Sequence, residues 1–232
     1  FSENDHLIVC ISWTYGSGGV NIGFKLADKL KINFYDAEIF EAVLKRLEAQ
    51  KDSIQDSVSY GIKPGIKKEQ AHDQDANVNP SEAFIPERHL TLRQHMREFS
   101  RFHGLPKRDA VFFNESDLLV DMAKKEDFVI LGRCGDAIMA NNNIPHISIY
   151  ITAPFEQRIK RAMEIDSSLT VKQARHMLKH LDHVHSQYYH YYTNRNWGHS
   201  NNYDLCINSA SYGIDGTVDF IYRMITAREE DK

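Results

Sequence analysis

The chain has 232 residues, of which 42% are hydrophobic and 26% are charged. This composition is that of an ordinary globular protein, and it excludes a collagen-like repeat, a coiled-coil rod and a wholly disordered chain. The 28 Lys and Arg residues are outnumbered by 32 Asp and Glu residues, which gives a net charge of -4. Because such a chain has no global positive field, we expect neither nucleic acid nor a membrane surface as a partner, and we expect any anion site to be local.

The cysteine usage indicates a reducing compartment. Cys10, Cys134 and Cys206 lie far apart and each stands in an apolar stretch, so neither a disulfide framework nor a cysteine metal site is expected. No apolar run approaches the roughly 20 residues of a membrane span, and no signal-peptide pattern opens the chain. We therefore expect a cytoplasmic protein. Because residue 1 is Phe rather than Met, the sequence leaves open whether the N-terminus is complete.

Short runs rich in β-branched residues alternate with longer helical patterns, which predicts βαβ units around a parallel sheet. The predicted strands cover residues 7–12, 32–35, 128–131, 146–152 and 203–208. The predicted helices cover residues 22–30, 38–49, 111–125, 136–140, 154–165 and 214–228. Several strands are apolar on both faces, as strands buried between two helix layers are. We therefore expect a single α/β domain over residues 1–232, with a five-stranded parallel sheet flanked by helices.

The periodicity is lost between residues 50 and 87, where the chain is polar and interrupted by glycines and prolines. This pattern predicts a long insertion, and loops of such length usually have a function. Beyond it, Arg93, Arg97 and Arg101 are spaced four residues apart and would share one face of a helix. That face is either a solvated basic surface or a stripe that faces an anion, and both interpretations stay open.

A glycine-rich turn, Gly16 to Gly19, connects the first predicted strand to the first predicted helix. Glycines let successive backbone amides converge on an oxyanion, and the helix N-terminus adds a partial positive charge. The full P-loop pattern, GxxxxGK followed by Ser or Thr, is absent, because Gly19 holds the lysine position and Asn21 the hydroxyl position. Binding of the outer phosphates and of Mg²⁺ is weakened accordingly. Taken alone, the turn is a phosphate cradle or a structural tight turn.

Six motifs, in this order, resemble those of the cytidylate kinase-like family: YGSGGVNIG, INFYDAEIF, VILGRCGD, IYITAPFEQRIKRAM, HLDHVHSQYYHYYTNRNWG and NYDLCINSASYGIDGTVDFI. The resemblance covers nearly the whole chain except residues 50 to 110. It implies a P-loop kinase-like fold with a helical acceptor-side insertion at about residues 50–110 and a lid at about residues 166–200. The oligomeric state does not follow from it.

The resemblance implies that the protein moves the γ phosphate of ATP, with Mg²⁺, to a nucleoside monophosphate such as CMP. Two alternatives stay open. The chain is either a catalytically weak or inactive relative that binds nucleotide as a regulator or acts through a partner, or a kinase for a different small acceptor. Acceptor specificity would lie in the unmatched region between residues 50 and 110.

The resemblance also implies roles for individual residues. The donor phosphates would be bound by the glycine loop, which consists of Gly16, Ser17, Gly18, Gly19, Val20 and Asn21. The expected catalytic residues are Asp36, Arg133, Arg158 and Arg195, with Asp36 also the expected Mg²⁺ ligand. The expected substrate-binding residues are Arg97, Asp136, Arg161 and His185. Each also has a structural interpretation, with Asp36 as a helix cap and the arginines as surface ion pairs or solvated residues.

The chain departs from the family pattern at two places. Family members usually carry charged side chains at three positions around the glycine turn, where this chain has Trp13, Val20 and Asn21. The family lid is usually rich in arginine, whereas His183 and His185 stand here. An imidazolium has two donors and a positive charge, so a histidine lid would bind phosphate better at low pH. The alternative is that both histidines are exposed helix residues without ligand contact.

Two further patterns stand in the predicted lid. His176 and His180 would share a helical face, but a zinc site needs three or four converging ligands, so we do not expect a metal there. The tyrosine run from Tyr188 to Tyr192 could stack on bases. A helix that packs its tyrosines against the core is the interpretation we favour.

Overall fold

The computed structural model describes residues 6–36, 107–132 and 134–230. The chain divides into two compact units, one formed by Phe1–Ala37 with Arg108–Lys232 and the other by Glu38–Lys107. The account below concerns the first unit. The predicted helix at 38–49, most of the predicted insertion at 50–110 and the arginine series from Arg93 to Arg101 lie outside the described residues.

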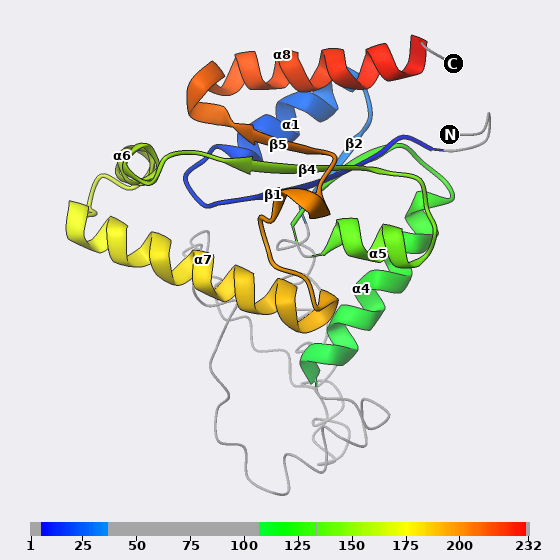
Figure 1. Cartoon of the computed structure of the whole chain (residues 1–232), viewed down its shortest axis with the longest axis horizontal. Coiled ribbons are helices and arrows are strands. Elements are labelled where there is room, and N and C mark those ends of the chain that lie inside the picture. The colour runs from blue at the N-terminus through cyan, green and yellow to red at the C-terminus, as the bar shows by residue number, and fades with distance from the viewer. Residues whose placement is uncertain (1–5, 37–106, 133, 231–232) are drawn as a thin grey trace, which may run out of the picture. The chain divides into compact units, whose positions relative to one another are not determined.

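Five parallel strands form one sheet in the order β2-β3-β1-β4-β5 (Figure 1). The strands are β1 (Ile8–Trp13), β2 (Asn33–Asp36), β3 (Phe128–Leu131), β4 (Ile147–Thr152) and β5 (Leu205–Asn208). All six residues of β1 are buried, because this central strand is covered on both faces. The predicted α/β fold with a five-stranded parallel sheet is therefore confirmed, and each strand lies within two residues of its predicted bounds.

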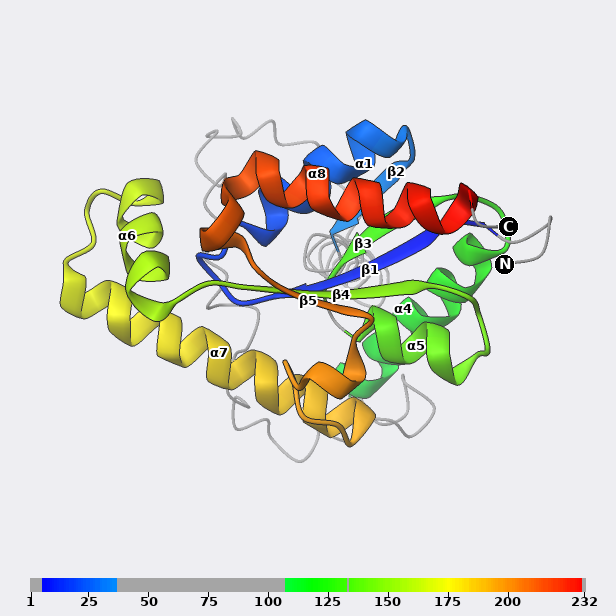
Figure 2. The same ribbon diagram turned by 45° about the horizontal axis from the view of Figure 1, so that its top comes forward.

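Helices cover both faces of the sheet (Figures 1 and 2). The described α-helices are α1 (Gly19–Leu30), α4 (Lys107–Ala123), α5 (Gly135–Asn141), α6 (Phe155–Ile165), α7 (Val171–Thr193) and α8 (Ser209–Glu230). Val9 and Ile11 of β1 belong to the core under α1 and α8, whereas Ile8 and Cys10 belong to the core under α4 and α5. Alternate side chains of this one strand thus pack into two separate hydrophobic cores, one on each face of the sheet.

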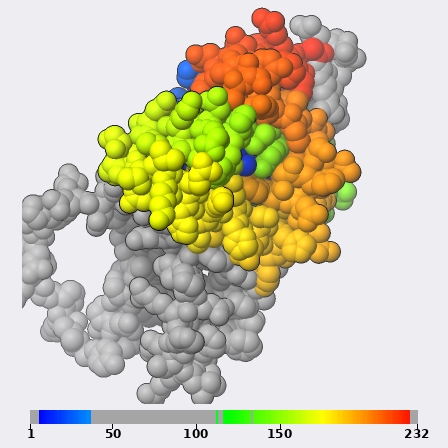
Figure 3. All heavy atoms as spheres, turned by 60° about the vertical axis from the view of Figure 1, so that its left-hand side comes forward, coloured from blue at the N-terminus to red at the C-terminus, as the bar shows by residue number. Residues whose placement is uncertain are grey.

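The predicted lid contains one long helix, α7, whose N-terminus is fixed by a capping box between Thr170 and Gln173. Apolar residues of α6 and α7 pack together, including Ile159 and Leu178. Figure 3 shows this side of the molecule, where α6 and α7 form much of the surface. The pairing places α7 beside the helix that follows β4.

The tyrosines of α7 differ in their environments. Tyr189 is buried beside Cys134 and Ala137, whereas Tyr191 is exposed. Tyr192 stacks on Phe112 of α4, with ring centroids 3.9 Å apart. The prediction that this helix packs tyrosine against the core is thus confirmed for Tyr189. In the part of the chain that the structure describes, no helix has the length and apolar character to cross a membrane.

Candidate functional site

The glycine loop lies between the end of β1 and the start of α1, and its backbone requires glycine. Gly16 and Gly18 have φ angles of +80° and +82°, in the left-handed region that side chains disfavour. A Cβ atom at Gly16 would lie 2.8 Å from the carbonyl oxygen of Arg158. A Cβ atom at Gly18 would lie 2.5 Å from Cδ1 of Ile214. The loop is therefore tightly enclosed by α6 and α8, which fixes its shape.

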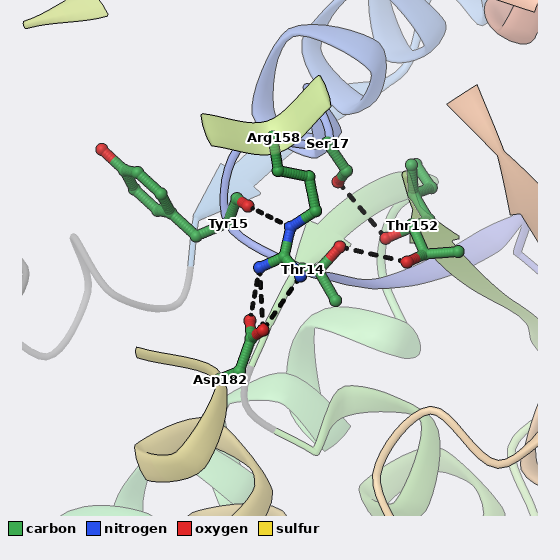
Figure 4. A network of polar contacts seen from close by, with 7 residues as sticks. Thr14, Tyr15, Ser17, Thr152, Arg158 and Asp182 are labelled. Carbon is green, nitrogen blue, oxygen red and sulfur yellow. Dashed lines mark hydrogen bonds and ion pairs between the residues drawn. The ribbon is translucent and has the colours of Figure 1, made fainter. Parts of the chain in front are cut away.

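Hydrogen bonds tie the loop to the neighbouring strand β4 (Figure 4). The Thr14 amide donates to the Ile151 carbonyl at 3.0 Å, and the buried Ser17 hydroxyl donates to the same carbonyl at 3.3 Å. The Ser209 hydroxyl at the start of α8 donates to the Ser17 carbonyl at 2.6 Å. Ser17 therefore anchors the loop through its side chain. The loop is preformed by contacts within the protein.

The first turn of α1 leaves amide donors available. Gly18 is the N-cap residue, no side chain caps the helix, and the first turn has no acidic residue. The amides of Gly19, Val20 and Asn21 have no acceptor within the helix, because a helix leaves its first amides unbonded. Amides and helix dipole together favour an anion at this point. Val20 and Asn21 are exposed, so this end of α1 is accessible.

Asp36 lies at the carboxyl end of β2, in register with Leu131 at the end of β3. In the strand order β2-β3-β1, these two ends lie on the same edge of the sheet as the glycine loop. Ligands of open α/β sheets bind outside the carboxyl ends of the strands. Asp36 is half-buried. Arg133, which follows β3, and Arg97 lie outside the described residues, so their assigned roles stay predictions.

The Arg158 side chain forms hydrogen bonds to two other residues of the protein (Figure 4). Its Nε donates to the carbonyl oxygen of Tyr15 at 2.7 Å, and its Nη1 and Nη2 donate to the carboxylate of Asp182 at 2.7 to 2.9 Å. The Arg158 side chain is only 6% exposed. Its guanidinium thus links the glycine loop to α7, and the catalytic role that we assigned to it stays a prediction.

Arg161 lies one helical turn after Arg158 and reaches the glycine loop. A Cβ atom at Gly18 would lie 3.1 Å from both Cζ and Nη1 of Arg161, so this guanidinium lies against the glycine at the start of α1. Arg161 is half-buried. Within the described residues it has neither a hydrogen bond nor an ion pair. It is therefore a cation beside the N-terminus of α1.

Asp136 is buried beneath the turn after β3. One carboxylate oxygen, Oδ2, accepts a hydrogen bond from the Tyr189 hydroxyl at 2.7 Å, and Oδ1 has no partner. Burial raises the pKa of Asp136, although the Tyr189 hydrogen bond and the charge of Arg195 oppose this rise. Burial and the nearby Asp136 charge also raise the pKa of Tyr203 to about 12. The structure thus places Asp136 and Arg195 within electrostatic reach of each other.

The two histidines of the predicted lid lie in different environments. His183 is exposed, whereas His185 is half-buried. The His185 ring contacts Trp197 and Trp13, with centroid distances of 5.7 Å and 6.4 Å. Trp13 itself packs against Gly19 in the glycine loop. His185 therefore lies one aromatic ring away from the loop.

Three features of the site were missed by the sequence interpretation. They are the ion pair of Arg158 with Asp182, the hydrogen bond from Tyr189 to Asp136 and the packing of Trp13 against Gly19. The first two pairs join residues 24 and 53 positions apart, and no local pattern connects them. Among the residues that the structure describes, no group of three or more His, Cys, Asp and Glu side chains could hold a metal ion.

Comparison with known proteins identifies a matching protein family. A model described as "Cytidylate kinase-like family" matches residues 8–211. A crystal structure of an uncharacterised protein from Eubacterium ventriosum has a TM-score of 0.63 at 22% identity, and the match covers 95% of this chain and 99% of that chain. This likeness shows a shared fold. No curated protein sequence matches the chain.

Shikimate kinases are also among the similar solved structures. The enzyme from Bacteroides thetaiotaomicron has a TM-score of 0.49 at 12% identity, with 95% of this chain and 98% of that chain covered. The enzyme from Acinetobacter baumannii has a TM-score of 0.46 at 12% identity, with 97% and 96% covered.

Proposed function

Because the chain belongs to the cytidylate kinase-like family, we propose that it is a phosphotransferase that binds ATP at the glycine loop. The acceptor that we propose is a nucleoside monophosphate such as CMP. The observation that carries this proposal is the preformed loop above the uncapped start of α1, where Gly19, Val20 and Asn21 have amides without helical acceptors. These donors suit the oxygen atoms of a phosphate chain.

The proposed reaction is an in-line displacement at the γ phosphorus atom. An oxygen of the acceptor phosphate forms a bond to phosphorus, the bond to the bridging oxygen breaks, and ADP leaves with the electron pair. Such a transfer depends mainly on positioning and on positive charge around the migrating group. In this chain the loop would hold the donor and Arg133 would bind the acceptor phosphate as a bidentate donor.

Mg²⁺, when bound, would neutralise part of the phosphate charge. Magnesium in such sites keeps several waters and needs only one or two carboxylates besides the phosphates. Asp36 has the carboxylate and the position at the sheet edge to be one of them. Asn21 offers an amide oxygen where a P-loop would offer a hydroxyl. We assign these two residues to the metal on that ground.

A second candidate function is nucleotide binding without turnover, in which the protein acts as a regulator or through a partner. One observation favours it. A side chain at position 19 would collide with Trp13, so the lysine of a P-loop has no room in this structure. Loss of that lysine weakens stabilisation of the outer phosphates more than it weakens the backbone cradle.

The experiment that decides between these functions combines two measurements on the purified chain. ATP with Mg²⁺ is titrated by calorimetry, and products are screened with CMP, dCMP, UMP, AMP and no acceptor. ATP binding with one phosphorylated monophosphate supports the kinase. ATP binding with no product supports the regulator, and absence of ATP binding refutes both.

The cytoplasmic location also belongs to this proposal. The three cysteines are all free in the structure, with Cys10 and Cys134 buried and Cys206 exposed. Isolated free cysteines are typical of proteins in a reducing compartment.

A further inference from the structure

The space that a P-loop lysine would need is filled by an aromatic ring. A Cβ atom at Gly19 would lie 2.5 Å from Cβ and 2.7 Å from Cδ1 of Trp13, closer than carbon atoms approach without a bond. The indole extends to the end of β3, where a Cβ at Gly132 would lie 3.3 Å from its Cζ3. Trp13 is 7% exposed and part of the core under α1 and α8. Trp13, which precedes the loop, thus fills the space that a lysine side chain at position 19 would occupy.

Another cation reaches the loop from α6. The guanidinium of Arg161 lies against Gly18, which is the residue directly before the missing lysine and the N-cap of α1. A guanidinium stays charged across the accessible pH range and carries five donors. Half-buried, it is less screened than a surface charge. None of the described side chains competes for it.

The other described arginine of α6 is committed elsewhere. Arg158 uses Nε, Nη1 and Nη2 on Tyr15 and Asp182. That bond to the Tyr15 carbonyl holds α6 against the loop, and it fixes the helix rotation that points Arg161 at Gly18 one turn later. The two arginines therefore have different roles. Arg158 positions the helix and Arg161 presents the charge.

We propose that Arg161 replaces the P-loop lysine and binds the outer phosphates of the nucleotide held by the glycine loop. This inference rests on the proposed function, because it assigns a cation to the same phosphate site. It predicts that phosphate affinity depends on the Arg161 side chain, which comes from α6 and not from the loop. Trp13 occupies the space that a lysine side chain at position 19 would need.

The test uses two probes on the full chain, ATP and inorganic tripolyphosphate, each titrated by calorimetry. Tripolyphosphate isolates the phosphate contacts from those of the base and sugar. Replacement Arg161→Ala should weaken both probes by about tenfold to a hundredfold, the range of a lost hydrogen bond to a charged group. Arg161→Lys should retain part of the affinity, because it keeps the charge and loses the planar fork.

Lys160→Ala is the matched control, since Lys160 is the preceding residue of the same helix, carries the same charge and is exposed. It should change the affinity for either probe less than twofold. Thermal unfolding of each variant separates lost binding from lost structure.

A rescue variant provides a further test. In the Arg161→Ala background, Trp13→Ala makes space beside position 19 and Gly19→Lys places a lysine there. The affinity for tripolyphosphate should then recover. If the wild-type chain bound neither probe, the proposed function would fail and this inference with it. If the wild type bound both probes and Arg161→Ala bound them equally well, only the role of Arg161 would be refuted.

Discussion

Arg158 of α6 and Asp182 of α7 form a bidentate ion pair, and the Nε of the same guanidinium donates a hydrogen bond to the carbonyl oxygen of Tyr15. A single planar group thus connects the phosphate loop, the helix after β4 and the long helix of the predicted lid. The position of α7 and the shape of the loop are therefore coupled through one side chain.

We predict that this pair contributes strongly to stability. Arg158→Met leaves the Asp182 carboxylate, which is 28% exposed, without its arginine donor and removes the hydrogen bond to the Tyr15 carbonyl, so the free energy of unfolding should fall by about 2–4 kcal/mol. A double-mutant cycle of Arg158→Met and Asp182→Asn, followed by urea unfolding, gives the coupling energy.

The control cycle uses the pair Arg175 and Glu156, which also joins α7 to α6 but is 43% and 67% exposed. Its coupling should be below about 1 kcal/mol, as is usual for exposed pairs. Equal coupling energies in the two cycles would contradict the importance of burial at Arg158.

We predict that Gly18→Val abolishes ATP binding. The left-handed backbone disfavours Val, and its Cβ would meet Ile214 and the Arg161 guanidinium. Gly213→Ala is the control, because Gly213 has a comparable φ of +68° but a Cβ there meets nothing within 4 Å. Because its ψ of 178° lies in a region that is essentially restricted to glycine, the variant should be destabilised by roughly 1–3 kcal/mol and still bind ATP. Unchanged calorimetric affinity in Gly18→Val would show that the loop is not the phosphate cradle.

We predict that Asp136 makes the protein less stable as the pH rises. Its pKa is raised by burial, so above the unfolded value of 3.8 the folded state holds this proton more tightly than the unfolded state does. Stability from this group is therefore full below that value and is lost as the pH rises through the raised pKa. Asp136→Asn has no such titration.

The measurement is the unfolding free energy of wild type and Asp136→Asn between about pH 4 and pH 7. The wild type should lose stability relative to the variant as the pH rises across this window. A difference that is constant with pH would mean that the carboxyl titrates alike in the folded and unfolded chain.

We predict that His185, and not His183, supports nucleotide binding. His185 packs against Trp13, which contacts the loop, whereas His183 is exposed. Loss of the His185 ring should loosen the indole of Trp13 that lies against Gly19, so His185→Ala should weaken ATP binding measured by calorimetry, whereas His183→Ala should leave it unchanged.

Equal ATP affinities in the wild type and in both variants would contradict this role of His185.

The sheet could be predicted from the sequence because its strands are short, apolar on both faces and separated by helical patterns. The glycine loop was found in the same way, since Gly16 to Gly19 stand between a strand and a helix. These signals are local. Each depends on residues within a few positions of one another, which is the range over which backbone preferences and periodicity act.

The contacts within the site could not be predicted, because they depend on how helices pack. Arg158 and Arg161 share a helical face at a spacing of three, and the sequence does not say which of them meets the loop. The partner of Arg158 is 24 residues away, on a helix that was taken as a lid. Trp13 and Gly19 were noted from the sequence only as two separate departures, one from the family pattern and one from the P-loop pattern.

The pairing of β1 has a consequence for the newly synthesised chain. Ile8 pairs with Phe128 and Val9 with Ile147, so the innermost strand has no neighbour until more than a hundred further residues have been made. At about 5–20 residues per second, the ribosome takes roughly 6–24 seconds to supply the first partner. Throughout that interval β1, in which Ser12 is the one polar residue, lacks both of its strand partners, so completion of the sheet centre is a late and non-local step of folding.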